Sequence, residues 1–89
     1  MLDIVKTKDF KRDIKKLKKT DASIVNIVQK VVYMLINKQP LPDKYKDHAL
    51  KHNWQGFRDC HIKPDLVLIY KITDNTLELH RLNSHSNLF

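Results

Sequence analysis

The sequence has few of the residues that cross-link or interrupt a chain. It contains one cysteine, Cys60, one glycine and three prolines among 89 residues. A lone cysteine cannot form an intramolecular disulfide, which suits a reducing compartment. With so little glycine and proline there is no flexible linker, so we expect one domain spanning residues 1–89.

Long hydrophobic runs are also absent. No segment is apolar enough over a sufficient length to cross a bilayer. Near the start, Asp3 and Lys6 stand where a secretory signal peptide needs an apolar stretch. We therefore expect a soluble, cytoplasmic protein with no membrane partner.

Positive charge is what the sequence has in excess. Lysine and arginine number 17 against 10 acidic residues, which gives a net charge of +7. A small basic domain attracts phosphate backbones or acidic proteins, so nucleic acid is a candidate partner.

The first third of the chain predicts a strand and a helix. Residues 2–7 alternate as in a strand, and Thr7 can cap a helix that begins at Lys8. Phe10, Ile14 and Leu17 form one narrow apolar stripe on that helix. The rest of its surface is basic and predicts contacts with RNA phosphates; we call the lysine ridge the set Lys11, Lys15, Lys16, Lys18 and Lys19.

A wide apolar face, containing Ile24, Val28 and Val31, predicts a second helix that ends before Pro40. Residues 40–53 read as a loop with room for one helical turn. The period then changes to two, which predicts strands at 54–62, 66–72 and 77–82 joined by short turns. The expected fold is α+β: an N-terminal strand, then two helices on one face of a twisted antiparallel sheet with a three-strand C-terminal meander. The other face of the sheet would be open to a ligand.

Histidine is the residue type that suggests chemistry. Of the five histidines, three lie near an acidic residue or the end of an element: His48, His61 and His85. The antiparallel order can bring these positions to one rim of the sheet. A metal site is one interpretation of clustered His and Asp, but the spacing shows no HExxH pattern. A Cys60–His61 pair is geometrically poor, because consecutive strand residues point to opposite faces.

Cleavage of RNA by its own 2′-hydroxyl group needs a base, an acid and a cation near the phosphate. Histidine serves the first two roles near neutral pH, and arginine serves the third. The candidate catalytic residues are His48, His61, Asp65, Arg81 and His85. We expect no metal and no other cofactor.

Four segments carry a family resemblance: KYKDHAL (44–50), WQGFR (54–58), HIKPDLVLIY (61–70) and RLNSHSNLF (81–89). Together and in this order they resemble the YafQ branch of the RelE superfamily of toxin–antitoxin ribonucleases. The resemblance implies an mRNA endonuclease, in this branch usually acting on the ribosome. It also implies neutralisation by a small antitoxin with an acidic segment.

Residue by residue, the resemblance places the five candidates above at the family's functional positions and adds Phe89, the aromatic residue close to the C-terminus, as an RNA contact. Two other function classes stay open. Related ParE-type toxins inhibit DNA gyrase without cutting RNA, and the lysine ridge alone would suit a non-catalytic RNA-binding module.

Overall fold

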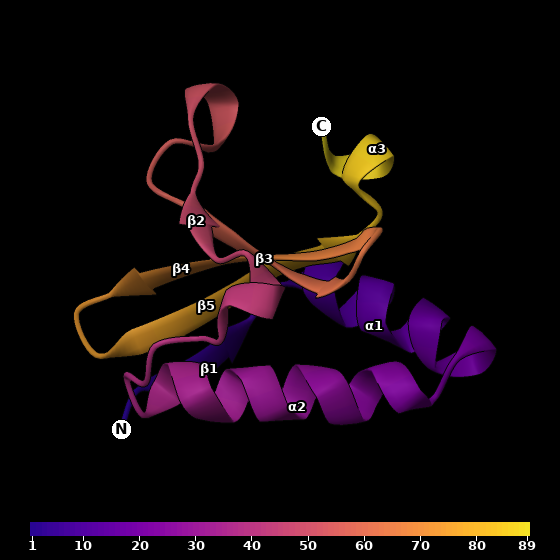
Figure 1. Ribbon diagram of the computed structural model, residues 1–89, viewed down its shortest axis with the longest axis horizontal. Helices are drawn as coiled ribbons and strands as arrows, with labels where there is room; N and C mark the ends of the chain where they lie inside the picture. Colours follow the sequence, from indigo (N-terminus) through magenta and orange to yellow (C-terminus); the bar gives the residue numbers. More distant parts are fainter.

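Two helices pack against one face of a five-stranded sheet, while a loop and the C-terminal segment stand on the other face (Figure 1). The computed structural model describes residues 1–89. Its helices and strands are β1 (Asp3–Lys6), α1 (Lys8–Thr20), α2 (Ser23–Ile36), β2 (His48–Ala49), β3 (Arg58–Lys63), β4 (Leu66–Thr73), β5 (Thr76–Asn83) and α3 (His85–Leu88). Two 3₁₀ turns, η1 (Asp43–Tyr45) and η2 (His52–Trp54), flank β2. No helix is long and apolar enough to span a membrane.

The start of α1 follows directly from its sequence. The Thr7 side chain accepts a hydrogen bond from the Phe10 backbone N–H, which satisfies one of the unpaired donors of the first turn. The chain breaks at Asp21, whose carboxylate accepts from the Ser23 backbone N–H. The predicted cap and the predicted break between the two helices are confirmed.

The sheet has the strand order β1-β5-β4-β3-β2. The three-strand meander β3–β4–β5 is antiparallel, as expected. The first strand differs from the expectation, because β1 pairs with β5 in parallel and the sheet is therefore mixed. The chain returns to β5 only after two helices and three strands, so no short turn restricts this pair to the antiparallel arrangement.

The segment between α2 and β3 contains more structure than the predicted loop. Residues His48 and Ala49 form β2, which pairs with the start of β3. The predicted strand 54–62 begins four residues late, at Arg58, because Trp54 belongs to η2. This segment and α3 cover part of the sheet face that was expected to be open (Figure 1).

The main core lies between the helices and the sheet. It contains 15 buried residues, among them Phe10 of α1, Val31 of α2 and Leu68 of β4. Cys60 is fully buried there, and burial raises the pKa of its thiol. On the opposite face, Val67, Ile69 and Leu88 form a much smaller cluster. The two faces of the sheet are therefore packed very unequally.

Candidate functional site

Asp47 and His48, where the chain enters β2, point to opposite faces of the sheet. On the helical face, Asp47 accepts hydrogen bonds from the Arg58 guanidinium, the Nη2 atom lying 3.1 Å from Oδ2, and from the Tyr70 hydroxyl. The bond to Asp47 raises the pKa of Arg58, and burial together with Asp47 raises that of Tyr70. This network ties the loop to the core.

On the other face, His48 lies opposite Asp59 of β3. The Nδ1 atom of His48 lies 2.7 Å from the carbonyl oxygen of Lys46, and since a carbonyl only accepts, Nδ1 carries the hydrogen. The Nε2 atom of the neutral ring is then free to accept a proton. The pairing of β2 with β3 thus fixes the position of His48, and the Lys46 carbonyl fixes its tautomer.

Asp59 is the most unusual group on this face, because it is a buried carboxylate with an incomplete set of partners. Its side chain is 2% exposed, and its Oδ1 atom lies 3.0 Å from His48 Nδ1 but receives no hydrogen bond of adequate geometry. Burial raises the pKa of Asp59, while the charges of His48, His61 and His85 oppose that rise. A costly buried carboxylate among three imidazoles is typical of a site that moves protons.

His61 and His85 approach Asp59 from two different elements. His61 lies on the same face of the sheet as Val67, its cross-strand partner in β4. His85 is the first residue of α3, which Ser84 caps by accepting from the Asn87 backbone N–H. Three of the predicted catalytic residues, His48, His61 and His85, therefore lie near enough to Asp59 for their charges to influence its carboxylate.

The C-terminal tail is held against these groups. Leu88 packs on Val67 and Ile69 in the small cluster. The ring centroid of Phe89 lies 4.8 Å from that of His85 and 6.5 Å from that of Trp54, and Phe89 remains 48% exposed. Leu88 thus anchors the tail, and Phe89 presents an aromatic surface beside His85.

The two other predicted catalytic residues lie outside this group. Asp65 is exposed in the turn between β3 and β4. Arg81 forms a two-point ion pair with Asp13 of α1, with Nε 2.8 Å from Oδ2, and this bond raises the pKa of Arg81. Asp13 also accepts from the Leu82 backbone N–H at 3.0 Å, at the edge of β5 that β1 leaves uncovered. The guanidinium of Arg81 is already engaged and does not touch Asp59.

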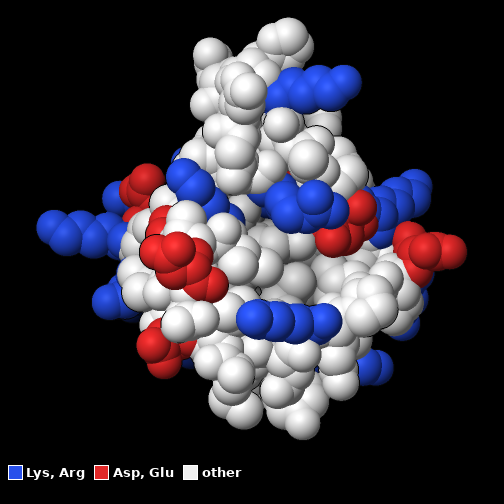
Figure 2. Space-filling view, turned by 90° about the vertical axis from the view of Figure 1, so that its left-hand side faces the viewer, with Lys and Arg blue, Asp and Glu red and all other residues white.

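The predicted RNA-binding lysines form a separate surface. All five members of the lysine ridge are exposed on α1, in the helical layer below the sheet as drawn in Figure 1. The histidines lie on the other side of that sheet. On the face that carries the β4–β5 turn, acidic and basic side chains are mixed around a shallow hollow, so the net charge forms no patch of one sign there (Figure 2).

Asp59 is the residue that the analysis of the sequence missed. Its signal is the spacing Asp59-Cys60-His61, because alternate residues of a strand share a face. The ring of His80 packs edge-on against Phe57, with ring centroids 4.7 Å apart, and bonds to Glu78. No three His, Cys, Asp or Glu side chains converge closely enough to hold a metal ion.

A family model described as "Bacterial toxin of type II toxin-antitoxin system, YafQ" matches residues 2–89. The chain is 38% identical over 87 residues to the mRNA interferase toxin YafQ of Escherichia coli strain B, covering 98% of this chain and 95% of that protein.

Two solved structures have the same fold. The metal-bound toxin from Helicobacter pylori is 49% identical, with a TM-score of 0.91 and full coverage of both chains. A chain of the E. coli DinJ–YafQ complex is 40% identical, with a TM-score of 0.85 over 100% of this chain and 99% of that one. These similarities extend over the whole fold, including the segments that carry the three histidines.

Proposed function

The chain belongs to the YafQ family and is a toxin of a type II toxin–antitoxin system, and from this premise we propose that it is an endoribonuclease that cleaves mRNA by metal-independent acid–base catalysis. The observation that carries the proposal is the buried carboxylate of Asp59, which lies opposite His48 in the sheet and is reached by the charges of His61 and His85. A pure inhibitor of another enzyme has no need of such a group.

In this mechanism one imidazole removes the proton from the 2′-hydroxyl and another protonates the departing 5′ oxygen. His48 suits the role of base, because its Nδ1–H is bonded to Lys46 and its Nε2 is free. His61 and His85 supply the other proton transfers. Asp59 supplies a buried carboxylate beside these rings, directly opposite His48 in the sheet.

Three further predictions from the sequence remain part of the proposal. Phe89 contacts a base next to the scissile phosphate, with its half-exposed ring beside His85. Asp65 and Arg81 contribute at the margin of the site, and Arg81 would have to loosen its bond to Asp13 to reach a phosphate.

The partners follow from the same premise. We propose that a small antitoxin with an acidic segment binds this chain, supported by the similarity to YafQ in its complex with DinJ. The lysine ridge lies across the sheet from the histidines, so we assign it to ribosomal RNA rather than to the strand being cut. Action on mRNA at the ribosome would take place in the cytoplasm.

The test is cleavage of a defined mRNA by the purified protein, alone and with ribosomes. We expect products that end in a 2′,3′-cyclic phosphate and a 5′-hydroxyl, because the 2′ oxygen is the nucleophile. A substrate with a 2′-deoxy sugar at the cleaved position should resist, and EDTA should leave the rate unchanged. Absence of cleavage in both settings together with inhibition of DNA gyrase would replace this proposal by the ParE-type alternative.

A further inference from the structure

A hollow lies at the edge of the sheet beside the histidines. Strand β2 pairs only with Arg58 and Asp59, so the remainder of β3 has no strand partner on that side. Helix α2 and the turn η1 flank this edge and leave a cavity of about 430 Å³. We call it the lysine groove, because the residues that line it include Lys30, Lys44, Lys46 and Lys63.

The groove is basic and contains no carboxylate among its lining residues. Lys63 bonds to Asp21 at the edge of the groove, while Lys30, Lys44 and Lys46 form no ion pair. All three have exposed side chains. The groove therefore has positive charge that the protein itself does not neutralise, which is an electrostatic match for a chain of phosphates.

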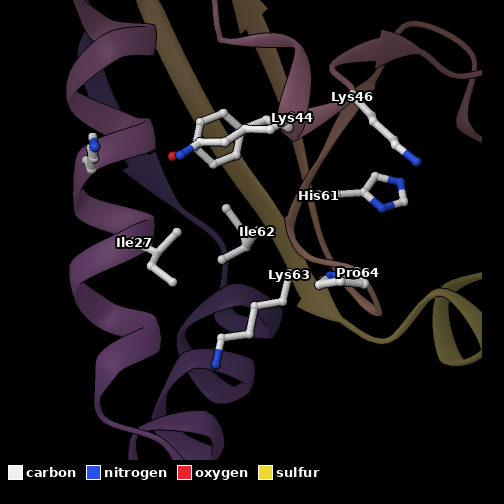
Figure 3. Close-up of a pocket in the computed structure, with 9 residues that line it drawn as sticks. Ile27, Lys44, Lys46, His61, Ile62, Lys63 and Pro64 are labelled. Carbon is white, nitrogen blue, oxygen red and sulfur yellow. The ribbon is translucent and has the colours of Figure 1, made fainter.

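The floor of the groove is apolar and offers no ring for base stacking. Ile27 and Ile62 point toward each other there (Figure 3). Tyr45 is only 5% exposed, with the ammonium group of Lys44 5.2 Å from its ring centroid. A nucleic acid in the groove would accordingly be held by its backbone rather than read by its bases.

The groove is continuous with the candidate active site. His61 lines the groove, and its charge opposes the rise in the pKa of Asp59. Figure 3 shows the ring of His61 beside Lys46. The backbone carbonyl of Lys46 is the group that fixes His48. If the reacting phosphate of an RNA strand lies among the histidines, the neighbouring phosphates of that RNA would lie in the groove.

We propose that the lysine groove binds the phosphodiester backbone of the RNA strand on one side of the scissile bond, without sequence preference. The proposal rests on the proposed function, which puts the scissile phosphate among the histidines. It assigns the grip on the substrate strand to α2, η1 and β3, and not to the lysine ridge of α1.

The experiment compares two double variants that lose the same two charges. Lys30→Gln/Lys44→Gln removes charge from the groove. The matched control is Lys6→Gln/Lys8→Gln, which removes two exposed charges at the β1 edge of the sheet, opposite the groove. The probe is a short 2′-O-methyl oligoribonucleotide, which cannot be cleaved because it lacks a free 2′-hydroxyl. Its affinity for the full-length protein is measured over a series of salt concentrations.

For the groove variant we expect the slope of log affinity against log salt to become shallower by about 1.4, since each phosphate contact to a single strand contributes roughly 0.7. With a cleavable oligonucleotide, KM should rise at least about tenfold with kcat little changed, equally for different sequences. The control variant should match the wild type in both measurements.

Equal slopes for the wild type and the groove variant, or a wild-type protein that does not bind the oligonucleotide, would overturn the proposal. A groove variant that loses antitoxin but keeps RNA would also overturn it, and would identify the groove as a site for the acidic antitoxin. Failure of the proposed function is a different result: the wild type would bind the oligonucleotide with the expected slope and yet not cut RNA.

Discussion

The two faces of the β-sheet are built for different purposes. The helical face buries a continuous core of 15 residues. The opposite face buries a cluster of three, beside which lie a carboxylate without its full set of hydrogen bonds and three histidines. The helical face supplies the stability of the fold, whereas the opposite face reduces that stability by holding titratable groups in place.

The largest expected effect tests the helical face. Leu68 is fully buried in the main core, so Leu68→Ala should lower the free energy of unfolding by about 2–5 kcal/mol. Val67, the next residue, points to the other face, and Val67→Ala should cost roughly half as much because its cluster is small. Urea unfolding measures both; equal losses would mean that the two faces contribute alike.

The next largest effect is on cleavage and concerns only the face of the sheet that carries the histidines. His61→Ala and His85→Ala should each reduce mRNA cleavage roughly 100-fold or more, because each removes a proton-transfer group. The melting temperature should change little. His52→Asn is the control, since His52 is exposed, has a positive φ that asparagine tolerates, and lies outside the group around Asp59. Near-normal cleavage by both alanine variants would refute the assignment of the site.

The last two residues of the tail are expected to have different roles, Phe89 in activity and Leu88 in stability. Phe89→Ala should reduce single-turnover cleavage about ten- to a hundredfold, as expected for the loss of stacking on one base, with little change in melting temperature. Leu88→Ala should instead lower the melting temperature, because Leu88 is buried against Val67 and Ile69. If both variants lose stability and the folded fraction cleaves normally, the tail only seals the sheet.

The smallest expected effect is an increase in the stability of the protein. Asp59→Asn should stabilise the protein by about 1 kcal/mol at neutral pH, because it removes an ionised group that burial penalises. The pKa of Asp59 is raised in the folded state, so wild-type stability should fall as pH rises from the ordinary aspartate pKa through the raised value. The variant should lack that decline. Cleavage should drop, because the three histidines lose the carboxylate beside them. A variant that is less stable at pH 7 would show that the carboxylate is structural.

Most of the fold could be predicted because its signals are local. The Thr7 cap, the apolar face of α2 and the two tight turns of the meander each depend on neighbouring residues. The parallel pairing of β1 with β5 could not, since it joins opposite ends of the chain. The two-residue strand β2 is too short to leave a periodic signal.

The site was predicted in part for the same reason. The three histidines carry their chemistry in their residue type, so the sequence alone suggests them as candidates, and their catalytic role stays a prediction. Asp59 becomes notable only when β2 places His48 opposite it. The engagement of Arg81 by Asp13 joins residues 68 positions apart and has no trace in the sequence pattern.

The opposite orientations of Asp47 and His48 also limit how this protein can change in length. Inserting one residue between them would put the anchor and the candidate catalytic group on the same face of the sheet, because alternate residues of a strand share a face. Residues added to the connection between α2 and Asp47 leave the pairs Asp47–Arg58 and His48–Asp59 intact, and loop length itself costs little. Related sequences should therefore differ freely in length before this dipeptide and never within it.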